Sequence, residues 1–307
     1  MATTGFKPKV YIHLIRHGQS QHNYSAIQYS KDQNYDPKNA DKSERARCKS
    51  VRDPGLTPHG INEAIDLRHR FPYMDKITHI LTSPLRRTLQ TMFLGFEPAI
   101  KRGIKPIALN ILRETGFGPN HFGSDLPSLL AEFGELGESV ITTEIEPGWE
   151  IPQVVRSPIE ISRRRNLVLS RLRELSNLAK MSESELNQAK KDFEELDPDT
   201  RSPFNMWLMK YDFPRLRDGK DVHIAVVTHG NFLKWMTFGE GVLFDNAEFR
   251  TFMFKGEEEG GPDPKADQSL HLVEMKESKD RPEAWLCEAD LVEKLRMREE
   301  WSGRGGC

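Results

Sequence analysis

Residues 10–18 read VYIHLIRHG and residues 222–230 read VHIAVVTHG, and these two stretches decide the fold. Each begins as a nearly continuous apolar run and ends in a His-Gly pair. Apolar runs of this length are typical of strands that are covered on both faces, as in a parallel sheet between two layers of helices. The sequence therefore predicts two buried strands, over residues 10–15 and 222–227, each followed closely by a histidine.

Further predicted strands and helices alternate with these two strands. Residues 78–82 and 104–112 predict strands of the same sheet, and residues 270–275 predict an edge strand. Capping-box spacing at Ser157 and Ser182 predicts two helices that end near residues 180 and 196. A Ser or Thr precedes Pro at three predicted helix starts, which are Thr57-Pro58, Ser83-Pro84 and Ser157-Pro158. This alternation predicts an α/β fold.

The composition is that of a globular protein, with 37% hydrophobic and 29% charged residues. A formal net charge of -2 provides no basic field for non-specific binding of nucleic acid. No apolar run approaches the roughly 20 residues that cross a bilayer, and residues 1–9 lack the apolar stretch of a signal peptide. The widely spaced Cys48, Cys287 and Cys307 argue against a disulfide framework and a zinc site. We therefore expect a cytoplasmic protein without nucleic-acid or membrane partners.

The first His-Gly pair belongs to a motif that suits phosphoryl transfer. In residues 16–23, RHGQSQHN, His17 is a candidate nucleophile and Arg16 is an adjacent cation for phosphate oxygens. Gly18 allows close approach of the backbone, and Asn23 adds a hydrogen-bond donor. A neutral imidazole can attack phosphorus when its other ring nitrogen is held by a hydrogen bond, usually to a carbonyl, that fixes the tautomer.

The second His-Gly pair, His229 with Gly230, follows the other strand in the same position. The carboxyl edge of a parallel sheet is where α/β proteins bind their ligands. A single histidine at a strand end commonly satisfies a local backbone hydrogen bond. Two of them at one edge favour a shared crevice instead.

Two further segments supply charged groups. In residues 82–91, TSPLRRTLQT, a strand end turns into a predicted helix whose positive end favours an anion, and Arg86 or Arg87 can add donors there. Glu114 follows another apolar segment and is a candidate acid for the leaving oxygen. Asp125 is a second candidate, because the Gly-rich segment 116–124 could return it to the pocket. Residues 163–165, three arginines on a long predicted helix, are expected on a solvated face.

Taken in order, these segments resemble the histidine phosphatase superfamily, also called the phosphoglycerate mutase-like family. The matching stretches are residues 14–23, 56–60 (LTPHG), 82–91, 112–114 (LRE) and 227–230 (VTHG). Ordered blocks of this kind are far more specific than one Arg-His-Gly. His22-Asn23, the long polar stretch after them and DPGLT at 53–57 look most like a fungal and plant branch often labelled phosphomutase-like.

The resemblance implies a three-layer α/β/α sandwich with a mostly parallel central sheet and helices on both faces. It implies a single domain over residues 1–307, with insertions at about 24–54 and 116–200 and a flexible C-terminal tail. It also implies a two-step reaction that uses no metal or other cofactor.

The resemblance also implies a role for each matching residue. By motif position, His17 is the expected phosphorylated nucleophile and Glu114 the proton donor. Arg87 is preferred to Arg86, because the arginine of the family falls four residues after the serine that matches Ser83. Glu63 stands where many members have Gln, a difference that we expect to affect only helix packing. The phosphoryl oxygens would be surrounded by Arg16, Asn23, Arg87, His229 and Gly230.

These assignments predict a phosphomonoester hydrolase that acts on a small phosphorylated molecule. Two alternatives stay open. A mutase would need a closed pocket with extra cations for a substrate carboxylate, and no motif identifies those cations. A non-catalytic member could bind a phosphorylated ligand, although such proteins usually lose the nucleophile or an arginine. The sequence does not indicate the substrate or the oligomeric state.

Overall fold

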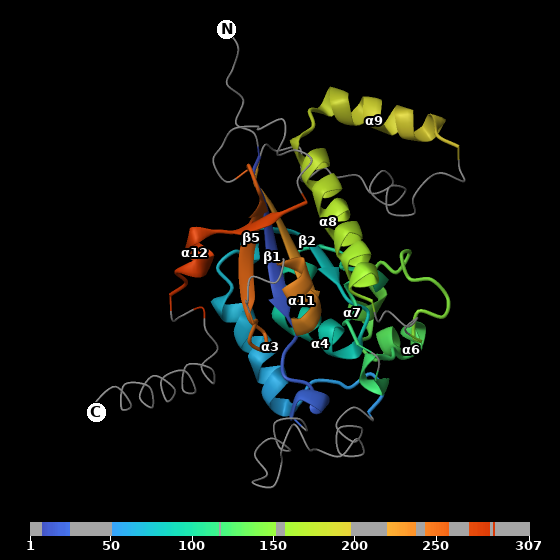
Figure 1. Cartoon of the computed structure of the whole chain (residues 1–307), viewed down its shortest axis with the longest axis vertical. Helices are drawn as coiled ribbons and strands as arrows, with labels where there is room; N and C mark the ends of the chain where they lie inside the picture. The colour runs from blue at the N-terminus through green and yellow to red at the C-terminus, as the bar shows by residue number, and fades with distance from the viewer. Residues whose placement is uncertain are drawn as a thin grey trace.

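The computed structural model describes residues 8–24, 51–116, 118–151, 157–197, 220–237, 243–257, 270–282 and 285. Its centre is a six-stranded sheet in the order β3-β2-β4-β1-β5-β6 (Figure 1). Strands β1 to β4 pair in parallel, β5 runs antiparallel to β1, and β6 runs antiparallel to β5. The strands are β1 Val10–Arg16, β2 Ile77–Thr82, β3 Ile107–Ala108, β4 Val222–Thr228, β5 Phe249–Phe254 and β6 Leu272–Glu274.

Strands β1 and β4 lie side by side in the middle of the sheet, as their apolar sequences predict. They pair in register from Val10 opposite Val222 to Arg16 opposite Thr228. The His17 N–H then donates to the Thr228 carbonyl at 3.0 Å. Because the register is unbroken, His17 and His229 leave the sheet next to each other at its carboxyl edge.

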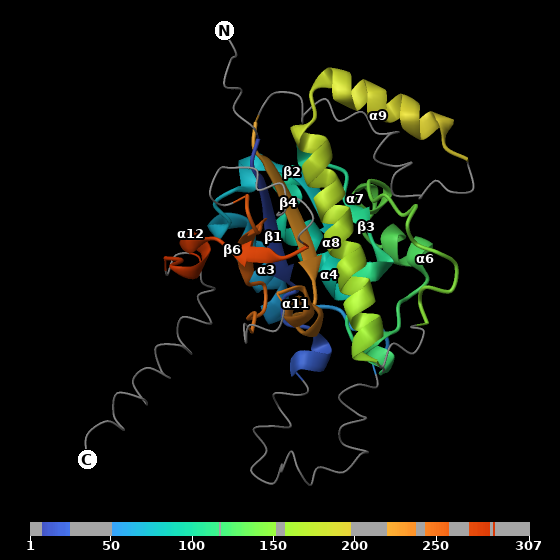
Figure 2. The ribbon, with the colours of Figure 1, turned by 45° about the horizontal axis from the view of Figure 1, so that its top comes forward.

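Helices cover both faces of the sheet, which confirms the α/β fold with helices in two layers (Figures 1 and 2). On one face, apolar residues of β1 and β4 pack against α8 and α11. On the other face, the sheet packs against α3, α4 and α5. The helices are α3 Pro58–Arg70, α4 Arg86–Gly95, α5 Glu97–Lys101, α6 Leu126–Ala131, α7 Glu135–Glu138, α8 Pro158–Lys180, α9 Glu183–Glu195, α11 Gly230–Met236 and α12 Lys276–Lys279. Short 3-10 turns occupy η1 Met74–Lys76, η2 Asn110–Leu112 and η3 Pro119–His121.

Most predicted elements are confirmed. Thr57, Ser157 and Ser182 cap α3, α8 and α9, and the last two form complete capping boxes. The predicted edge strand is β6. The strand predicted over 104–112 is wrong in extent, because only Ile107–Ala108 pairs and the chain then turns into η2. Its apolar side chains are nonetheless buried, apart from the partly buried Ile111, and burial alone does not separate a strand from a compact turn. Strand β5 was not predicted.

Several predictions concern residues that lie outside the described ranges. They include residues 25–50 of the first expected insertion and the C-terminal tail after residue 285. Of the second expected insertion, α6 to α9 are described, whereas residues 152–156 and 198–200 are not. No helix in the described part combines the length and the apolar composition that a membrane span requires.

Three histidines are buried in the sheet away from its carboxyl edge. His13 Nδ1 lies 3.0 Å from Thr251 Oγ1, and His13 Nε2 lies 3.0 Å from His223 Nδ1. Burial lowers the pKa of His13 well below its usual range, and lowers the pKa values of His79 and His223 to about 4. The native protein therefore keeps these imidazoles neutral where an unfolded chain would protonate them.

We expect the free energy of unfolding to decrease as the pH falls from 6.5 toward 4. In this window the histidines of the unfolded chain become protonated, whereas the buried histidines of the native protein stay neutral. Each such histidine lowers the free energy of unfolding by up to about 1.4 kcal/mol per pH unit. Urea unfolding at pH 7.5, 6.5 and 5.5 measures this slope. His79→Gln should flatten the slope, whereas His69→Gln, at an exposed position on α3, should not. A free energy of unfolding that stays constant or rises toward pH 5.5 would contradict the prediction.

Candidate active site

The candidate nucleophile, His17, is buried directly after β1 with its ring held in one tautomer. Its Nδ1 lies 2.7 Å from the Gly18 carbonyl, which can only accept, so Nδ1 carries the proton. Its Nε2 therefore has the free lone pair, toward which Arg87 Nε donates at 3.3 Å. Burial lowers the pKa of His17 well below its usual range, and the charges of Arg87 and Arg16 lower this pKa further. The ring is thus a neutral imidazole in the tautomer that attack through Nε2 requires.

Three buried nitrogen atoms around this ring have no hydrogen-bond partner within the described residues. They are Arg16 Nε, Arg87 Nη2 and His229 Nδ1. The rings of His17 and His229 are 5.2 Å apart, and Arg87 is fully buried with its pKa lowered to about 10 by that burial. Buried polar nitrogen atoms without partners are costly, and the clustering of two guanidinium donors with a second imidazole indicates a site for an anionic ligand.

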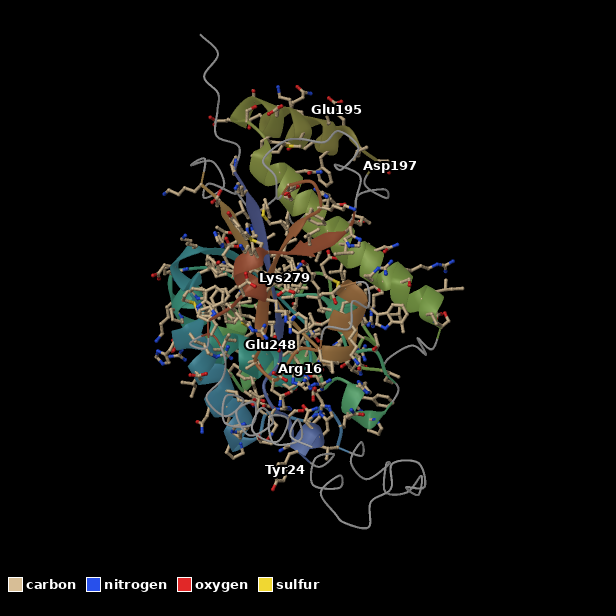
Figure 3. All side chains as sticks on the ribbon, turned by 60° about the vertical axis from the view of Figure 1, so that its left-hand side comes forward. Arg16, Tyr24, Glu195, Asp197, Glu248 and Lys279 are labelled. Atoms are coloured by element: carbon tan, nitrogen blue, oxygen red, sulfur yellow. The ribbon has the colours of Figure 1, made fainter. Side chains whose placement is uncertain are left out.

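Each of these side chains is held through another of its atoms. Arg16 Nη1 donates to the Phe244 carbonyl at 2.6 Å, and Arg87 Nη1 donates to the Asn120 carbonyl at 3.0 Å. His229 Nε2 lies 2.9 Å from Ser83 Oγ. Figure 3 shows Arg16 next to Glu248, whose carbonyl accepts the Arg16 N–H at 3.0 Å. The unpartnered nitrogen atoms are therefore fixed in place before any ligand arrives.

The start of α4 differs from the prediction. Ser83 does not cap the helix, which begins at Arg86 after Leu85 and has no cap from that residue's side chain. Asp53 Oδ1 accepts the Arg86 N–H at 2.9 Å, and Asp53 Oδ2 accepts the Ser124 N–H at 3.0 Å. The expected anion site at this helix end is thus already filled by a carboxylate of the protein. Ser83 is used instead to hold His229.

Glu114 is the acid that the structure brings to the cavity. Its Oε1 accepts the N–H groups of Thr115 at 2.7 Å and Phe232 at 3.1 Å, and its Oε2 accepts the Asn231 N–H at 3.3 Å. These bonds join Glu114 to the first turn of α11. Arg113 does not pair with it, and donates instead to the His121 carbonyl at 2.8 Å.

Asp125, the second candidate acid, lies elsewhere. It caps α6 by accepting the Ser128 N–H at 3.1 Å, and these bonds to Ser128 lower its pKa. It borders a second cavity, beside Arg52 and Trp149, and is absent from the lining of the cavity at His17. The structure therefore does not return Asp125 to the first cavity.

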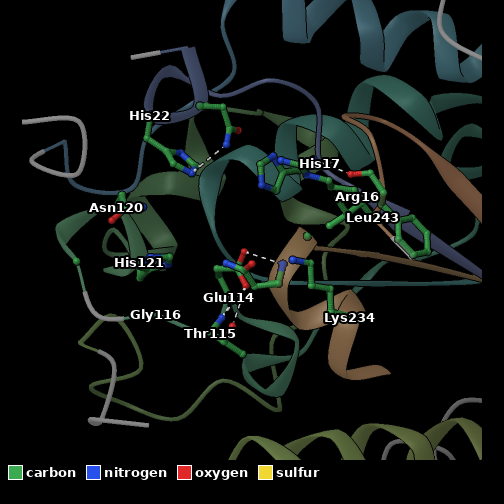
Figure 4. A pocket seen from close by; sticks show the side chains of 15 residues that line it. Arg16, His17, His22, Glu114, Thr115, Gly116, Asn120, His121, Lys234 and Leu243 are labelled. Carbon is green, nitrogen blue, oxygen red and sulfur yellow. Dashed lines mark hydrogen bonds between the residues drawn. The ribbon is translucent and has the colours of Figure 1, made fainter. Parts of the chain in front are cut away.

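The cavity at His17 has a volume of about 510 Å³ and includes residues that no motif indicated (Figure 4). His22, Asn120, His121 and Lys234 were not predicted as site residues. Asn120 and His121 come from η3, a loop turn that Arg113 holds through the His121 carbonyl. The lining comprises Arg16, His17, His22, Asn23, Glu114, Thr115, Gly116, Gly118, Asn120, His121, Gly230, Asn231, Lys234, Leu243 and Phe244.

Asn23 lines this cavity, and its side chain also has local partners. Its Oδ1 accepts the Ser20 hydroxyl at 2.7 Å and the Ser20 N–H at 3.2 Å. Its Nδ2 lies 3.3 Å from His22 Nε2. Asn23 therefore stabilises the turn after the His17 loop as well as bordering the cavity.

The LTPHG segment supports the His17 loop from behind. Thr57 caps α3, and its N–H donates to the Gln19 carbonyl at 2.9 Å. A Cβ atom on Gly60 would lie 2.0 Å from the Gln19 carbonyl oxygen, so only glycine allows this approach. Glu63 Oε2 accepts the Gln19 N–H at 2.6 Å, and burial raises the pKa of Glu63. The expectation that Glu63 affects only helix packing is therefore wrong, because it binds the loop itself.

The arginine cluster at 163–165 is not uniformly solvated. Arg163 is exposed, but the Arg164 guanidinium lies 4.4 Å from the centre of the Phe232 ring. Arg164 Nη2 donates to the Arg113 carbonyl at 2.8 Å, and burial lowers the Arg164 pKa to about 10. The solvated-face expectation is wrong for Arg164, which packs behind the segment that carries Glu114.

No group of three or more His, Cys, Asp or Glu side chains in the described ranges is arranged to hold a metal ion. The site is instead built from two guanidinium groups, two imidazoles and one carboxylate. These groups can hold a tetrahedral oxyanion, present a neutral nitrogen nucleophile to it and supply a proton.

A family model described as histidine phosphatase superfamily (branch 1) matches residues 12–177, just over half of the chain. A search of curated proteins found no match to the chain. Solved structures with similarity include phosphoserine phosphatase from Entamoeba histolytica, at 16% identity and TM-score 0.41, covering 87% of this chain and 95% of the other. A putative alpha-ribazole-5'-P phosphatase from Escherichia coli has 15% identity and TM-score 0.41, with coverage of 87% and 95%. Phosphoglycerate mutase from Bacillus anthracis has 17% identity and TM-score 0.36, with coverage of 81% and 89%. The fungal and plant branch stays a prediction.

We expect Gly60→Ala to lower the free energy of unfolding by about 1–3 kcal/mol, the usual cost of overpacking. The added methyl group must displace the Gln19 backbone, which is fixed by bonds to Thr57 and Glu63. Urea unfolding measures the change, with Asn62→Ala on the exposed side of α3 as the matched control. Equal stabilities of the two variants would show that the loop tolerates the methyl group.

Proposed function

Because the chain belongs to the histidine phosphatase superfamily, we propose that it is a phosphomonoester hydrolase whose His17 carries the phosphoryl group between two half-reactions. The substrate is a small phosphorylated molecule. The observation that carries the proposal is the neutral, tautomer-locked imidazole of His17 beside buried nitrogen atoms that lack partners. Such atoms supply hydrogen bonds and positive charge where a phosphoryl group needs them, without reorganisation at the moment of reaction.

In the first half-reaction, His17 Nε2 attacks phosphorus and the bond from phosphorus to the ester oxygen breaks. Glu114 donates a proton to that oxygen, so the product leaves as an alcohol. In the second half-reaction, Glu114 accepts a proton from a water molecule that attacks phosphorus. The bond between Nε2 and phosphorus then breaks, releasing inorganic phosphate and restoring neutral His17. The reaction as proposed uses no cofactor.

The phosphoryl oxygens are proposed to bind the unpartnered nitrogen atoms of Arg16, Arg87 and His229. Asn23 and Gly230 line the cavity with Arg16 and His17, whereas Arg87 and His229 are buried beside His17 and are not part of its lining. In each half-reaction, charge develops on these oxygens in the transition state. Removing one such donor typically costs about 3 kcal/mol of barrier.

The remaining expectations stay proposals. We propose that one domain spans residues 1–307 and that the protein acts in the cytoplasm, without nucleic-acid or membrane partners. The net charge of -2 supports the absence of non-specific binding to nucleic acid.

His17→Ala should reduce phosphate release by on the order of 10³-fold or more, because the phosphoryl group loses its acceptor. Wild-type protein quenched during turnover should carry acid-labile, alkali-stable phosphate, and the variant should carry none. Vanadate should inhibit the wild type. Full activity of purified His17→Ala would exclude the mechanism. Rapid isomerisation of phosphoglycerates with little phosphate release would exclude a hydrolase in favour of a mutase.

Glu114→Gln should slow hydrolysis of alkyl phosphates by about 10²–10⁴-fold, because their leaving oxygen needs a proton. The hydrolysis rate of an aryl phosphate should fall much less when its phenol has a low pKa, because that phenolate leaves without a proton. Asp125→Asn is the matched control and should change neither rate. Steady-state kinetics on the two ester types decides between these residues. A loss confined to Asp125→Asn would overturn the assignment of the acid.

A further inference from the structure

The cavity continues beyond the atoms that would hold the phosphoryl group. The described lining of the cavity is mainly polar, and its apolar side chains are Leu243 and Phe244. At about 510 Å³ it fits a small molecule and not an extended one. The polar side chains that line the cavity besides Arg16, His17, Asn23, Glu114 and Thr115 are those of His22, Asn120, His121, Asn231 and Lys234. A leaving group that occupies this space therefore meets hydrogen-bonding groups and a cation.

Lys234 lies one helical turn beyond Gly230, the residue of α11 that contacts Arg16. Gly230, where α11 begins, packs so closely on Arg16 that a Cβ atom there would lie 3.1 Å from Arg16 Nε. Lys234 is four residues further along, about 6 Å up the axis and on nearly the same face of the helix. Figure 4 shows its side chain extending into the cavity on the same side as Glu114.

Among the described residues, Lys234 has no acidic side chain paired with it. The side chain is exposed at the cavity, and it forms no ion pair with any described residue. The one acidic residue in the described lining is Glu114, whose two oxygens accept three backbone N–H groups. A neutral leaving group would leave this exposed ammonium group to water, whereas an anionic one would give it a charge-assisted hydrogen bond.

We infer that the leaving group of the substrate carries a second anionic group, a carboxylate or a second phosphate, and that Lys234 binds it. This inference rests on the proposed function, because it assigns the phosphoryl group to the Arg16 and His17 end. Lys234 is then a specificity-determining residue, which selects among phosphate esters without taking part in phosphoryl transfer.

The experiment compares esters that differ in one anionic group. One pair is 3-phosphoglycerate and glycerol 3-phosphate, which tests a carboxylate. The other is fructose 1,6-bisphosphate and fructose 6-phosphate, which tests a second phosphate. Phosphate release is measured for the wild type, Lys234→Met, Lys234→Arg and Lys191→Met, the last being an exposed lysine on α9 that does not line the cavity.

In at least one pair, the wild type should favour the more anionic ester by about tenfold in kcat/KM, the scale of one charge-assisted contact. Lys234→Met should abolish this preference, mainly by raising KM for the anionic ester, and should change the other ester less than about twofold. Lys234→Arg should keep the preference, and Lys191→Met should not alter it.

If Lys234→Met lowered kcat/KM equally for both members of a pair, the inference would be overturned. Lys234 would then act on Glu114, the proposed proton donor, and not on the leaving group. A preference that survives Lys234→Met, or is absent in the wild type, would overturn it as well. Neither result affects the proposed function, which fails separately if the wild type hydrolyses none of a broad panel of phosphate esters. In that case, thermal shifts of His17→Ala with inorganic phosphate and 3-phosphoglycerate test the binding on its own. Equal shifts with and without Lys234→Met would overturn the inference.

Discussion

The parallel register between β1 and β4 is the constraint on which the site depends. Arg16 stands opposite Thr228, so the next residues, His17 and His229, leave the sheet at the same level. A shift of the register by one residue would turn every side chain of one strand to the opposite face of the sheet. It would also separate the rings of His17 and His229. The register is secured because both strands are buried on both faces by apolar residues from two helical layers. The relative placement of His17 and His229 is therefore a consequence of core packing.

Burying two guanidinium groups beside two imidazoles is costly, and the protein offsets the cost only in part. Arg16 and Arg87 each use one nitrogen to hold a backbone carbonyl, while His229 uses one to meet Ser83. Another nitrogen of each stays without a partner, at about 1–3 kcal/mol apiece. Under the proposed function, the oxygens of a bound phosphoryl group would supply the missing partners. The same bonds that fix the side chains thus ensure that they need not rearrange for the ligand.

The sequence predicts the strands well, and it also predicts several residues that the structure brings together around His17, because both depend on short-range patterns. Apolar runs that end in His-Gly are visible in a few residues. Contacts between distant segments are not visible in this way. Ser83 looked like a helix cap, but the carboxylate at that helix end comes from Asp53, 33 residues earlier in the chain. Glu63 and Arg164 looked like surface or packing residues for the same reason, since their partners Gln19 and Arg113 lie 44 and 51 residues away.

Helix α11 concentrates three separate tasks in seven residues. Its first residue, Gly230, lies against Arg16, the backbone of its first turn holds Glu114, and Lys234 points into the cavity. The buried side of the helix is anchored independently, because Phe232 packs in the core and beneath the Arg164 guanidinium. The two sides have different freedom to change. A substitution at Phe232 would displace both Glu114 and the contact between Gly230 and Arg16. A substitution at exposed Lys234 would change only one side chain of the cavity lining. Under the proposed function, selectivity could therefore vary at this helix without disturbing the groups that are proposed to carry out the reaction.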